Sequence, residues 1–271
     1  MDSTIECADA RSLMKFNGNQ LRQLDLTIFN QSIQYIIHFL LEMNDNIFDD
    51  ESSYEILANE FNWGLVIIGQ INIEIDELKQ VPSKLNYLQI NSETLIDGKI
   101  TDWYNIKKDY KTFTQRDDNI RKNIHAIIIE ETSNADDNIL FIGGEMYAYG
   151  KIANYEEGMA ITDFEGIKND TELNNQPNLK VKLVNYFNLK LNDVLDNFMP
   201  DTCIINLLHG LGPHLARQLN ELYNNNILKK IIIVSCKPKE FEKDKHHLIM
   251  KTIRTKTIKT QSQALKIIII E

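Results

Sequence analysis

The chain has 271 residues, enough for one large α/β domain or two smaller ones, with 25% charged and 43% hydrophobic residues. No apolar run approaches the length of a membrane span, and three cysteines at unrelated spacings exclude a disulfide scaffold. The net charge of −10 excludes nucleic-acid binding by bulk charge, and the amino terminus lacks a signal-peptide pattern, so we expect a cytoplasmic protein.

From residue 20 to about residue 110, the hydrophobic pattern predicts an α+β region. Apolar residues at helical spacing predict one long helix, and changes of period predict strands. The expected elements are helices at 20–43 and 54–60, strands at 65–68, 71–75 and 85–90, and a hairpin-type turn at 97–98. This region shows no catalytic motif of its own.

From residue 117 onwards, helical and strand patterns alternate. The expected elements are helices at 117–131 and 214–223, and strands at 139–142, 158–163, 180–184, 202–208, 229–236 and 264–270. Strands spaced by helices or helix-length loops predict a mostly parallel, doubly wound sheet. The sequence therefore predicts an N-terminal α+β region over 1–112 and a Rossmann-like α/β domain over 113–271.

The segment after residue 230 carries the clearest chemical signal. Four aliphatic residues, Ile231 to Val234, lead into Ser235 and Cys236, so a buried strand ends with a thiol at the rim of the sheet. Open α/β sheets bind ligands beyond the carboxyl ends of their strands, which makes Cys236 a candidate nucleophile. The structural alternative is an inert cysteine, since free cysteines are often buried.

The charge is unevenly distributed along the chain. Residues 229–266 contain eleven Lys or Arg and three acidic residues, so this segment carries +8 and the remaining residues carry −18. Such an asymmetry fits either a local RNA-binding face or a set of solvated helix and strand faces. Any contact with RNA is expected in this basic segment.

Four segments, taken in order, resemble the RNA uracil-5-methyltransferases, the family that makes 5-methyluridine in tRNA and rRNA. They are Phe113-Thr114-Gln115, similar to a Phe-x-Gln element; residues 139–144, ILFIGG, similar to a first strand and glycine loop; residues 202–211, TCIINLLHGL, in the place of an Asp-Pro-Pro-Arg motif; and residues 234–238, VSCKP, similar to Ser-Cys-Asn-Pro. The resemblance covers the chain from about residue 61 to the carboxyl terminus. It implies a class I methyltransferase-like fold that binds S-adenosylmethionine.

The resemblance also implies roles for individual residues. Cys236 would be the nucleophile, because a thiolate that adds to carbon 6 of uracil makes carbon 5 nucleophilic enough to accept a methyl group. Phe113, Gln115 and Asn206 would lie at the target base. The cofactor would be held by Gly143 and Gly144 of the glycine loop and by Asp163, which ends a strand and would bind ribose hydroxyls. No metal ligand is implied, since His209 and His214 have no spacing typical of a metal site.

Three departures from the family pattern leave two functions open. Glu145, Met146 and Tyr147 follow the two glycines where further glycine is expected, and Asn206 to His209 replaces Asp-Pro-Pro-Arg. Residues 262–264, Ser-Gln-Ala, replace the family's His-x-Glu, so the catalytic base is missing, and only Glu145 and Glu271 suggest themselves as substitutes. The chain is therefore either a divergent methyltransferase or an inactive pseudo-methyltransferase that acts as an RNA-binding or regulatory subunit with a protein partner.

Overall fold

The computed structural model describes residues 2–80, 84–174, 176–186, 189–207, 210–237 and 245–271. The chain forms two compact units. The larger unit contains Met1–Cys7, Thr112–Thr114 and Ile120–Glu271, and the smaller unit contains Ala8–Lys111 and Gln115–Asn119. The boundary expected between residues 112 and 113 falls in the segment where the chain crosses between the two units.

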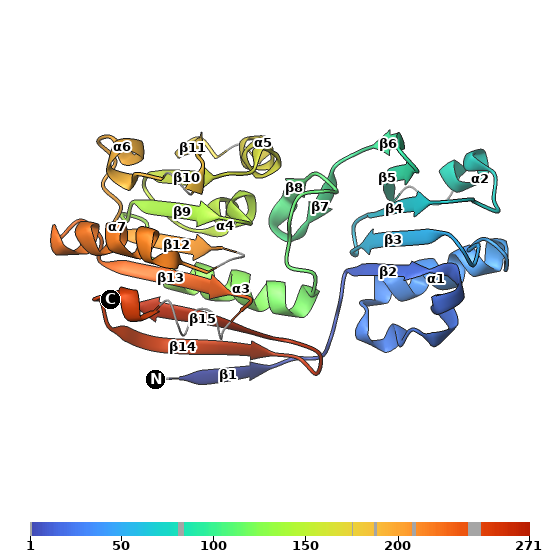
Figure 1. Cartoon of the computed structure of the whole chain (residues 1–271), viewed down its shortest axis with the longest axis horizontal. Helices are drawn as coiled ribbons and strands as arrows, with labels where there is room; N and C mark the ends of the chain where they lie inside the picture. Colours follow the sequence, from blue (N-terminus) through green and yellow to red (C-terminus); the bar gives the residue numbers. More distant parts are fainter. Residues whose placement is uncertain (1, 81–83, 175, 187–188, 208–209, 238–244) are drawn as a thin grey trace. The chain divides into compact units, whose positions relative to one another are not determined.

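The larger unit is built on an eight-stranded sheet of order β1-β14-β15-β13-β12-β9-β10-β11 (Figure 1). Its strands are β1 (Ser3–Glu6), β9 (Ile139–Gly143), β10 (Gly158–Thr162), β11 (Leu179–Leu183), β12 (Thr202–Asn206), β13 (Lys230–Ser235), β14 (Thr252–Lys259) and β15 (Ala264–Ile270). Among these strands only β15 is antiparallel to its neighbours. The central strands β9, β10 and β12 are buried at every position, as strands covered on both faces must be.

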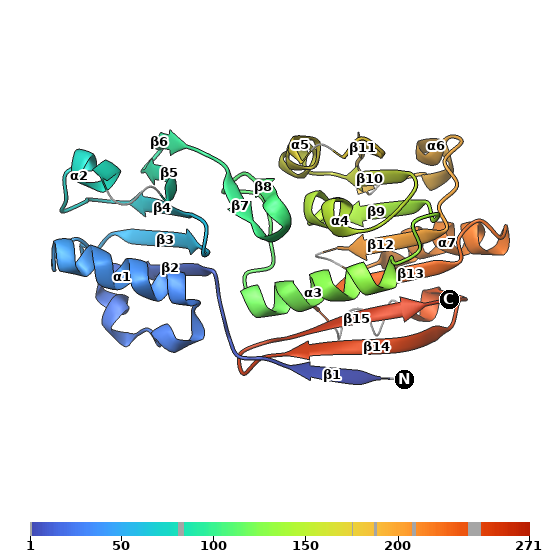
Figure 2. The ribbon, with the colours of Figure 1, turned by 180° about the vertical axis from the view of Figure 1, so that it is seen from behind.

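Helices cover both faces of this sheet. Figure 1 shows α6 (Leu191–Leu195) and α7 (Gly212–Asn224) on the near face, and Figure 2 shows α3 (Asp118–Glu131) and α4 (Met146–Ile152) on the opposite face. The short helix α5 (Glu165–Leu173) connects β10 and β11. On the face of α7, Leu215, Ala216 and Leu219 pack in one hydrophobic cluster with β-strand residues such as Ile205 and Ile233. The arrangement is doubly wound, as the alternating pattern predicts.

The smaller unit has a five-stranded sheet of order β2-β3-β4-β5-β6 and a two-stranded ribbon of β7 and β8. Its elements are β2 (Leu13–Asn17), β3 (Ser53–Ala58), β4 (Trp63–Ile68), β5 (Leu85–Ile90), β6 (Glu93–Asp97), β7 (Ile100–Asp102), β8 (Ile106–Lys108), α1 (Gln31–Met43) and α2 (Ile75–Gln80). Helix α1 buries Ile33, Ile36, Ile37 and Leu40 in the core that covers the sheet.

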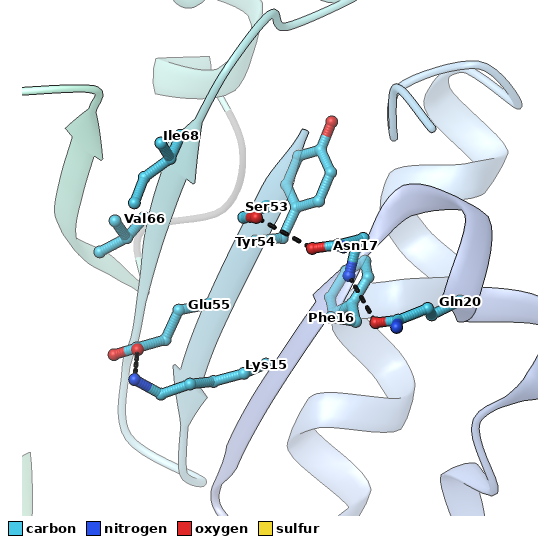
Figure 3. Close-up of a pocket in the computed structure, with 9 residues that line it drawn as sticks. All are labelled: Lys15, Phe16, Asn17, Gln20, Ser53, Tyr54, Glu55, Val66 and Ile68. Carbon is cyan, nitrogen blue, oxygen red and sulfur yellow. Dashed lines mark hydrogen bonds and ion pairs between the residues drawn. The ribbon is translucent and has the colours of Figure 1, made fainter. Parts of the chain in front are cut away.

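A shallow hollow lies over β2, β3 and β4 (Figure 3). Lys15 and Glu55 form an ion pair across two of these strands, and Ser53 Oγ donates a hydrogen bond to Asn17 Oδ1 over 2.9 Å. Ile68, which is 59% exposed, supplies the apolar part of its rim. Two pairs of polar side chains at the hollow are thus bound to each other, and the candidate site residues belong to other parts of the chain.

The predictions for the smaller unit were wrong in four elements, one of them the hairpin-type turn at 97–98, which leads from β6 to β7, strands of two different sheets. The expected long helix is divided into two 3₁₀ turns, Gly18–Gln23 and Leu26–Ile28, followed by α1, whose amino end is capped by Asn30. The expected helix at 54–60 is strand β3, paired on both sides, and the expected strand at 71–75 is a turn that leads into α2. Short apolar runs fit both the helical and the strand period of apolar residues, and here pairing with neighbouring strands decides which structure forms.

Candidate functional site

The candidate site residues of the larger unit lie at one edge of its sheet. Because β9, β10, β12 and β13 are parallel, their carboxyl ends meet at the same edge (Figure 1). Gly143 and Asn206 are register partners at the ends of β9 and β12. Asp163 directly follows β10, and Cys236 directly follows β13. Four residues expected at the site from sequence are therefore brought to one edge.

The glycine loop after β9 is shaped by close contact with β12. Gly143 has φ +106°, and a Cβ at this position would lie 2.1 Å from the backbone oxygen of Asn206. The next residue, Gly144, donates its N–H to the same oxygen over 2.7 Å. A Cβ on Gly144 would lie 3.1 Å from the ring of Phe113. Only glycine fits at position 143, and any larger residue at position 144 would be in tight contact with the ring of Phe113.

Glu145, the residue that departs from the expected loop pattern, is the centre of a buried polar cluster. Its carboxylate, 1% exposed, accepts hydrogen bonds from Thr114 Oγ1 over 3.1 Å, Tyr149 OH over 3.0 Å and Asn206 Nδ2 over 3.1 Å. Arg121 Nη1 donates to Thr114 Oγ1 over 2.9 Å and brings a buried positive charge to the cluster. Asn206 therefore donates to the cluster with its side chain, and its role at a target base stays a prediction.

Cys236 is exposed and directly follows β13, the strand that pairs with β12, at whose end Asn206 lies. Burial raises the pKa of Tyr149 well above its ordinary value, and the carboxylate of Glu145 and the sulfur of Cys236 raise it further. Tyr149 is thus a neutral hydrogen-bond donor to the Glu145 carboxylate. By contrast, burial raises the pKa of Cys203, which lies in the core as an inert side chain.

The Phe113-Thr114-Gln115 element is divided between the two units. The carbonyl oxygen of Phe113 accepts a hydrogen bond from Tyr147 OH over 3.0 Å, so Phe113 and Thr114 both contact the glycine loop and its helix. Gln115 is buried in the smaller unit, where its Oε1 accepts a hydrogen bond from the backbone N–H of Arg116 over 2.8 Å. The structure thus places Phe113 at the loop, while the expected role of Gln115 at the base stays a prediction.

Beside Asp163, the sheet edge carries exposed apolar side chains that sequence reasoning missed. Asp163 is exposed, and its neighbour Phe164 is 51% exposed. Leu183, the register partner of Thr162 on the adjacent strand, is 49% exposed. Tyr186 OH donates to the carbonyl oxygen of Ile161 over 2.9 Å. The sequence signal for this surface is a large apolar residue, Phe164, directly after the acid Asp163 at the end of the strand.

Acidic residues of α3 pair with three basic residues of the segment 229–266. The carboxylate of Glu131, 2% exposed, pairs with Lys230 over 2.9 Å and with Arg254 over 2.7 Å, and Lys256 pairs with Glu130 over 2.7 Å. Lys251 and Lys259 of the same segment are exposed. Part of the expected RNA-binding charge therefore holds α3 against the sheet.

The remaining expectations concern two motif residues, a metal site and a membrane span. His209 and Pro238, which complete two of the motifs, lie outside the described residues. Across the described ranges, no three His, Cys, Asp or Glu side chains gather as a metal site would require. In the same ranges, no helix has the length and apolarity needed to cross a membrane.

Neither a known protein family nor a curated protein matches the sequence. Solved structures do match the fold. The tRNA (uracil-54, C5)-methyltransferase of Pyrococcus abyssi, solved with S-adenosyl-L-homocysteine, has a TM-score of 0.70 and 11% identity over 99% of this chain and 78% of its own. A Streptococcus mutans protein assigned as S-adenosylmethionine-dependent methyltransferase has a TM-score of 0.52 and 11% identity over 97% of this chain and 76% of its own.

This chain has a class I methyltransferase fold. The predicted fold class is thereby confirmed, and the structures similar to this chain include an enzyme of the kind that the four sequence segments resemble. At 11% identity, the similarity establishes the fold and leaves the activity to be argued from the site.

Proposed function

We propose that the protein is an S-adenosylmethionine-dependent RNA methyltransferase that modifies carbon 5 of uracil through Cys236. The observation that carries this proposal is the position of Cys236: an exposed thiol that follows β13, at the same sheet edge as the glycine loop and Asp163. The fold similarity over 99% of the chain to a tRNA (uracil-54, C5)-methyltransferase supports the same substrate class.

The residues at the sheet edge fit an adenosine-containing cofactor. Asp163 offers an exposed carboxylate for ribose hydroxyls, and the exposed side chains of Phe164 and Leu183 offer apolar surface for a purine ring. Gly143 and Gly144 leave the backbone open to close approach. The Glu145 carboxylate already accepts three hydrogen bonds from the protein, so we assign it no contact with the cofactor. When bound, S-adenosylmethionine supplies a methyl group on a sulfonium ion.

In the proposed reaction, the Cys236 thiolate adds to carbon 6 of the target uracil and leaves the ring as an enolate. Carbon 5 of the enolate is then nucleophilic enough to take up the methyl group. Once the methyl group has been transferred and S-adenosylhomocysteine has left, water accepts the proton from carbon 5. The electron pair of that C–H bond restores the double bond, and the bond between carbon 6 and sulfur breaks to release the thiolate. Phe113 would pack beside the base, as the resemblance implies.

The first experiment measures the binding of S-adenosylmethionine by calorimetry, with S-adenosylhomocysteine as a second ligand. We expect micromolar affinity for the wild type and at least about tenfold weaker binding for Asp163→Ala, because the ribose hydroxyls lose a charged acceptor. The matched control is Asp193→Ala, an exposed acid on α6. No binding by the wild type at millimolar concentration would refute the cofactor assignment.

The second experiment traps the covalent intermediate on RNA that contains 5-fluorouracil. The fluorine at carbon 5 cannot leave as a proton would, so the adduct with the thiolate should accumulate and survive denaturing electrophoresis. We expect the wild type and Cys7→Ala to form the adduct and Cys236→Ala to form none. An adduct with Cys236→Ala would show that Cys236 is not the nucleophile.

The buried Glu145 carboxylate in the glycine loop favours a second candidate, a non-catalytic RNA-binding or regulatory subunit on the same fold. This candidate expects no affinity for S-adenosylmethionine and a stable protein partner on purification. Methyl transfer by the purified monomer would exclude it.

A further inference from the structure

Three contacts join the segment Phe113–Thr114 to the glycine loop and the start of α4. Thr114 Oγ1 donates to Glu145 over 3.1 Å, and Tyr147 OH donates to the carbonyl oxygen of Phe113 over 3.0 Å. The ring of Phe113 packs against Gly144, at 3.1 Å from where a Cβ would be. All of these residues belong to the larger unit. The loop that would hold the cofactor and the segment that would meet the base are therefore in direct contact.

Glu145 occupies its position against two physical penalties. Its backbone has φ 56°, in the left-handed region that favours glycine. Its carboxylate is 1% exposed, and burial of a charge is unfavourable unless it is fully hydrogen-bonded. A glycine would avoid both penalties, but it could not accept the hydrogen bond from Thr114. The side chain thus provides a contact that the small residue expected in this loop cannot make.

We infer that Glu145 is a positioning residue that couples the cofactor loop to the base-binding segment Phe113–Thr114. The inference rests on the proposed function for the identity of the two ligands. Its structural basis is that the same carboxylate is bound by Thr114 from the segment, by Tyr149 from α4 and by Asn206 from the end of β12. A ligand that orders the glycine loop then also orders the Phe113–Thr114 segment, and by linkage the reverse holds with the same free energy.

Backbone hydrogen exchange in the full-length protein without ligand tests the coupling directly. Thr114→Val removes the hydroxyl that joins the two segments, so exchange should become about fivefold faster both at residues 112–114 and at the amides of Gly144, Ala148 and Tyr149. Thr114→Ser keeps the hydroxyl and should restore slow exchange at both places. The matched control is Thr171→Val, because the buried Thr171 hydroxyl bonds only the Ile167 carbonyl of its own helix among the contacts described.

The outcomes separate the coupling from general destabilisation. Faster exchange at residues 112–114 alone, or equal acceleration in Thr171→Val, would overturn the inference. If Thr114→Val does not fold, Glu145→Gln tests the same contact. The glutamine amide has one acceptor oxygen for the hydrogen bonds that the two carboxylate oxygens of Glu145 accept. In this variant too, both segments must change together.

Addition of S-adenosylmethionine separates the inference from the proposed function. In the wild type, the cofactor should slow exchange at the glycine loop and at residues 112–114 together; in Thr114→Val it should protect the loop alone. Protection of the loop without residues 112–114 in the wild type would refute the coupling. Failure of the cofactor to protect either place would refute the proposed cofactor, while the exchange measured without ligand would still decide the coupling.

Discussion

His125 of α3 and Tyr149 of α4 meet edge to face in the interior, with ring centroids 6.3 Å apart, and both are uncharged. Burial, and then the positive charge of Arg121, lowers the pKa of His125 from 6.5 to about 3. Burial and the carboxylate of Glu145 raise the pKa of Tyr149. In the same interior, Thr114 Oγ1 bridges the side chains of Arg121 and Glu145.

The neutral His125 makes stability depend on pH. Between pH 6.5 and pH 3 the unfolded chain binds a proton at this residue and the folded chain does not, so stability should fall as the pH falls. From pH 7 to pH 5 the loss amounts to about 2 kcal/mol. Urea unfolding of His125→Leu should lack this component, whereas the exposed His246→Leu should keep it. Equal pH dependence in wild type and His125→Leu would contradict the prediction.

At the residue scale, the residues at the ends of strands could be predicted from the sequence, whereas the hydrogen-bond network of side chains could not. Gly143, Asp163 and Cys236 each follow an aliphatic run, and parallel pairing brings such positions to one edge. The bonds from Tyr149 and Thr114 to Glu145 depend on a left-handed turn and on the placement of a distant segment. Neither leaves a periodic signal in the sequence.

At the scale of elements, the approach of β9 to β12 fixes the glycine loop. Gly143→Ala should destabilise the protein by about 3 kcal/mol or more, since the added Cβ meets a backbone oxygen in addition to the strain of positive φ. Gly212→Ala is the matched control, because φ is +66° there and no atom lies within 4 Å of the added Cβ. It should cost only about 1 kcal/mol. Equal losses in thermal unfolding would show that Asn206 yields to the added atom.

Elements with a uniform sequence pattern were predicted well, and elements with a mixed pattern were not. The buried strands β9 and β12 and the helix α3 lie close to their expected bounds. Strand β14, TIRTKTIK, was missed because its charged residues resemble a solvated face, whereas in the fold Arg254 and Lys256 pair with acids of α3. Contacts between elements, absent from any local window, decided these cases.

At the scale of the whole molecule, the net charge of −10 requires any RNA contact to be local. Since Lys230, Arg254 and Lys256 are paired with acids of α3, the exposed Lys251 and Lys259 are the better candidates. Replacement of both by Ala should make the negative slope of log affinity against log salt shallower by about 1.4 when a transcribed tRNA is the ligand.

The control for this prediction is Lys180→Ala, an exposed lysine on the strand β11 at the opposite edge of the same sheet. It should leave the slope unchanged. An unchanged slope in the double variant would show that RNA does not bind at the basic segment.

The pairing of β1 with β14 joins two strands that lie far apart in the sequence, with Ile5 opposite Ile258. During synthesis on the ribosome, β1 emerges long before β14 has been translated. Its backbone groups must therefore remain hydrogen-bonded to water, or be held by a chaperone, until β14 has been made. We expect this pairing to form late in folding, because contacts this distant in sequence form slowly.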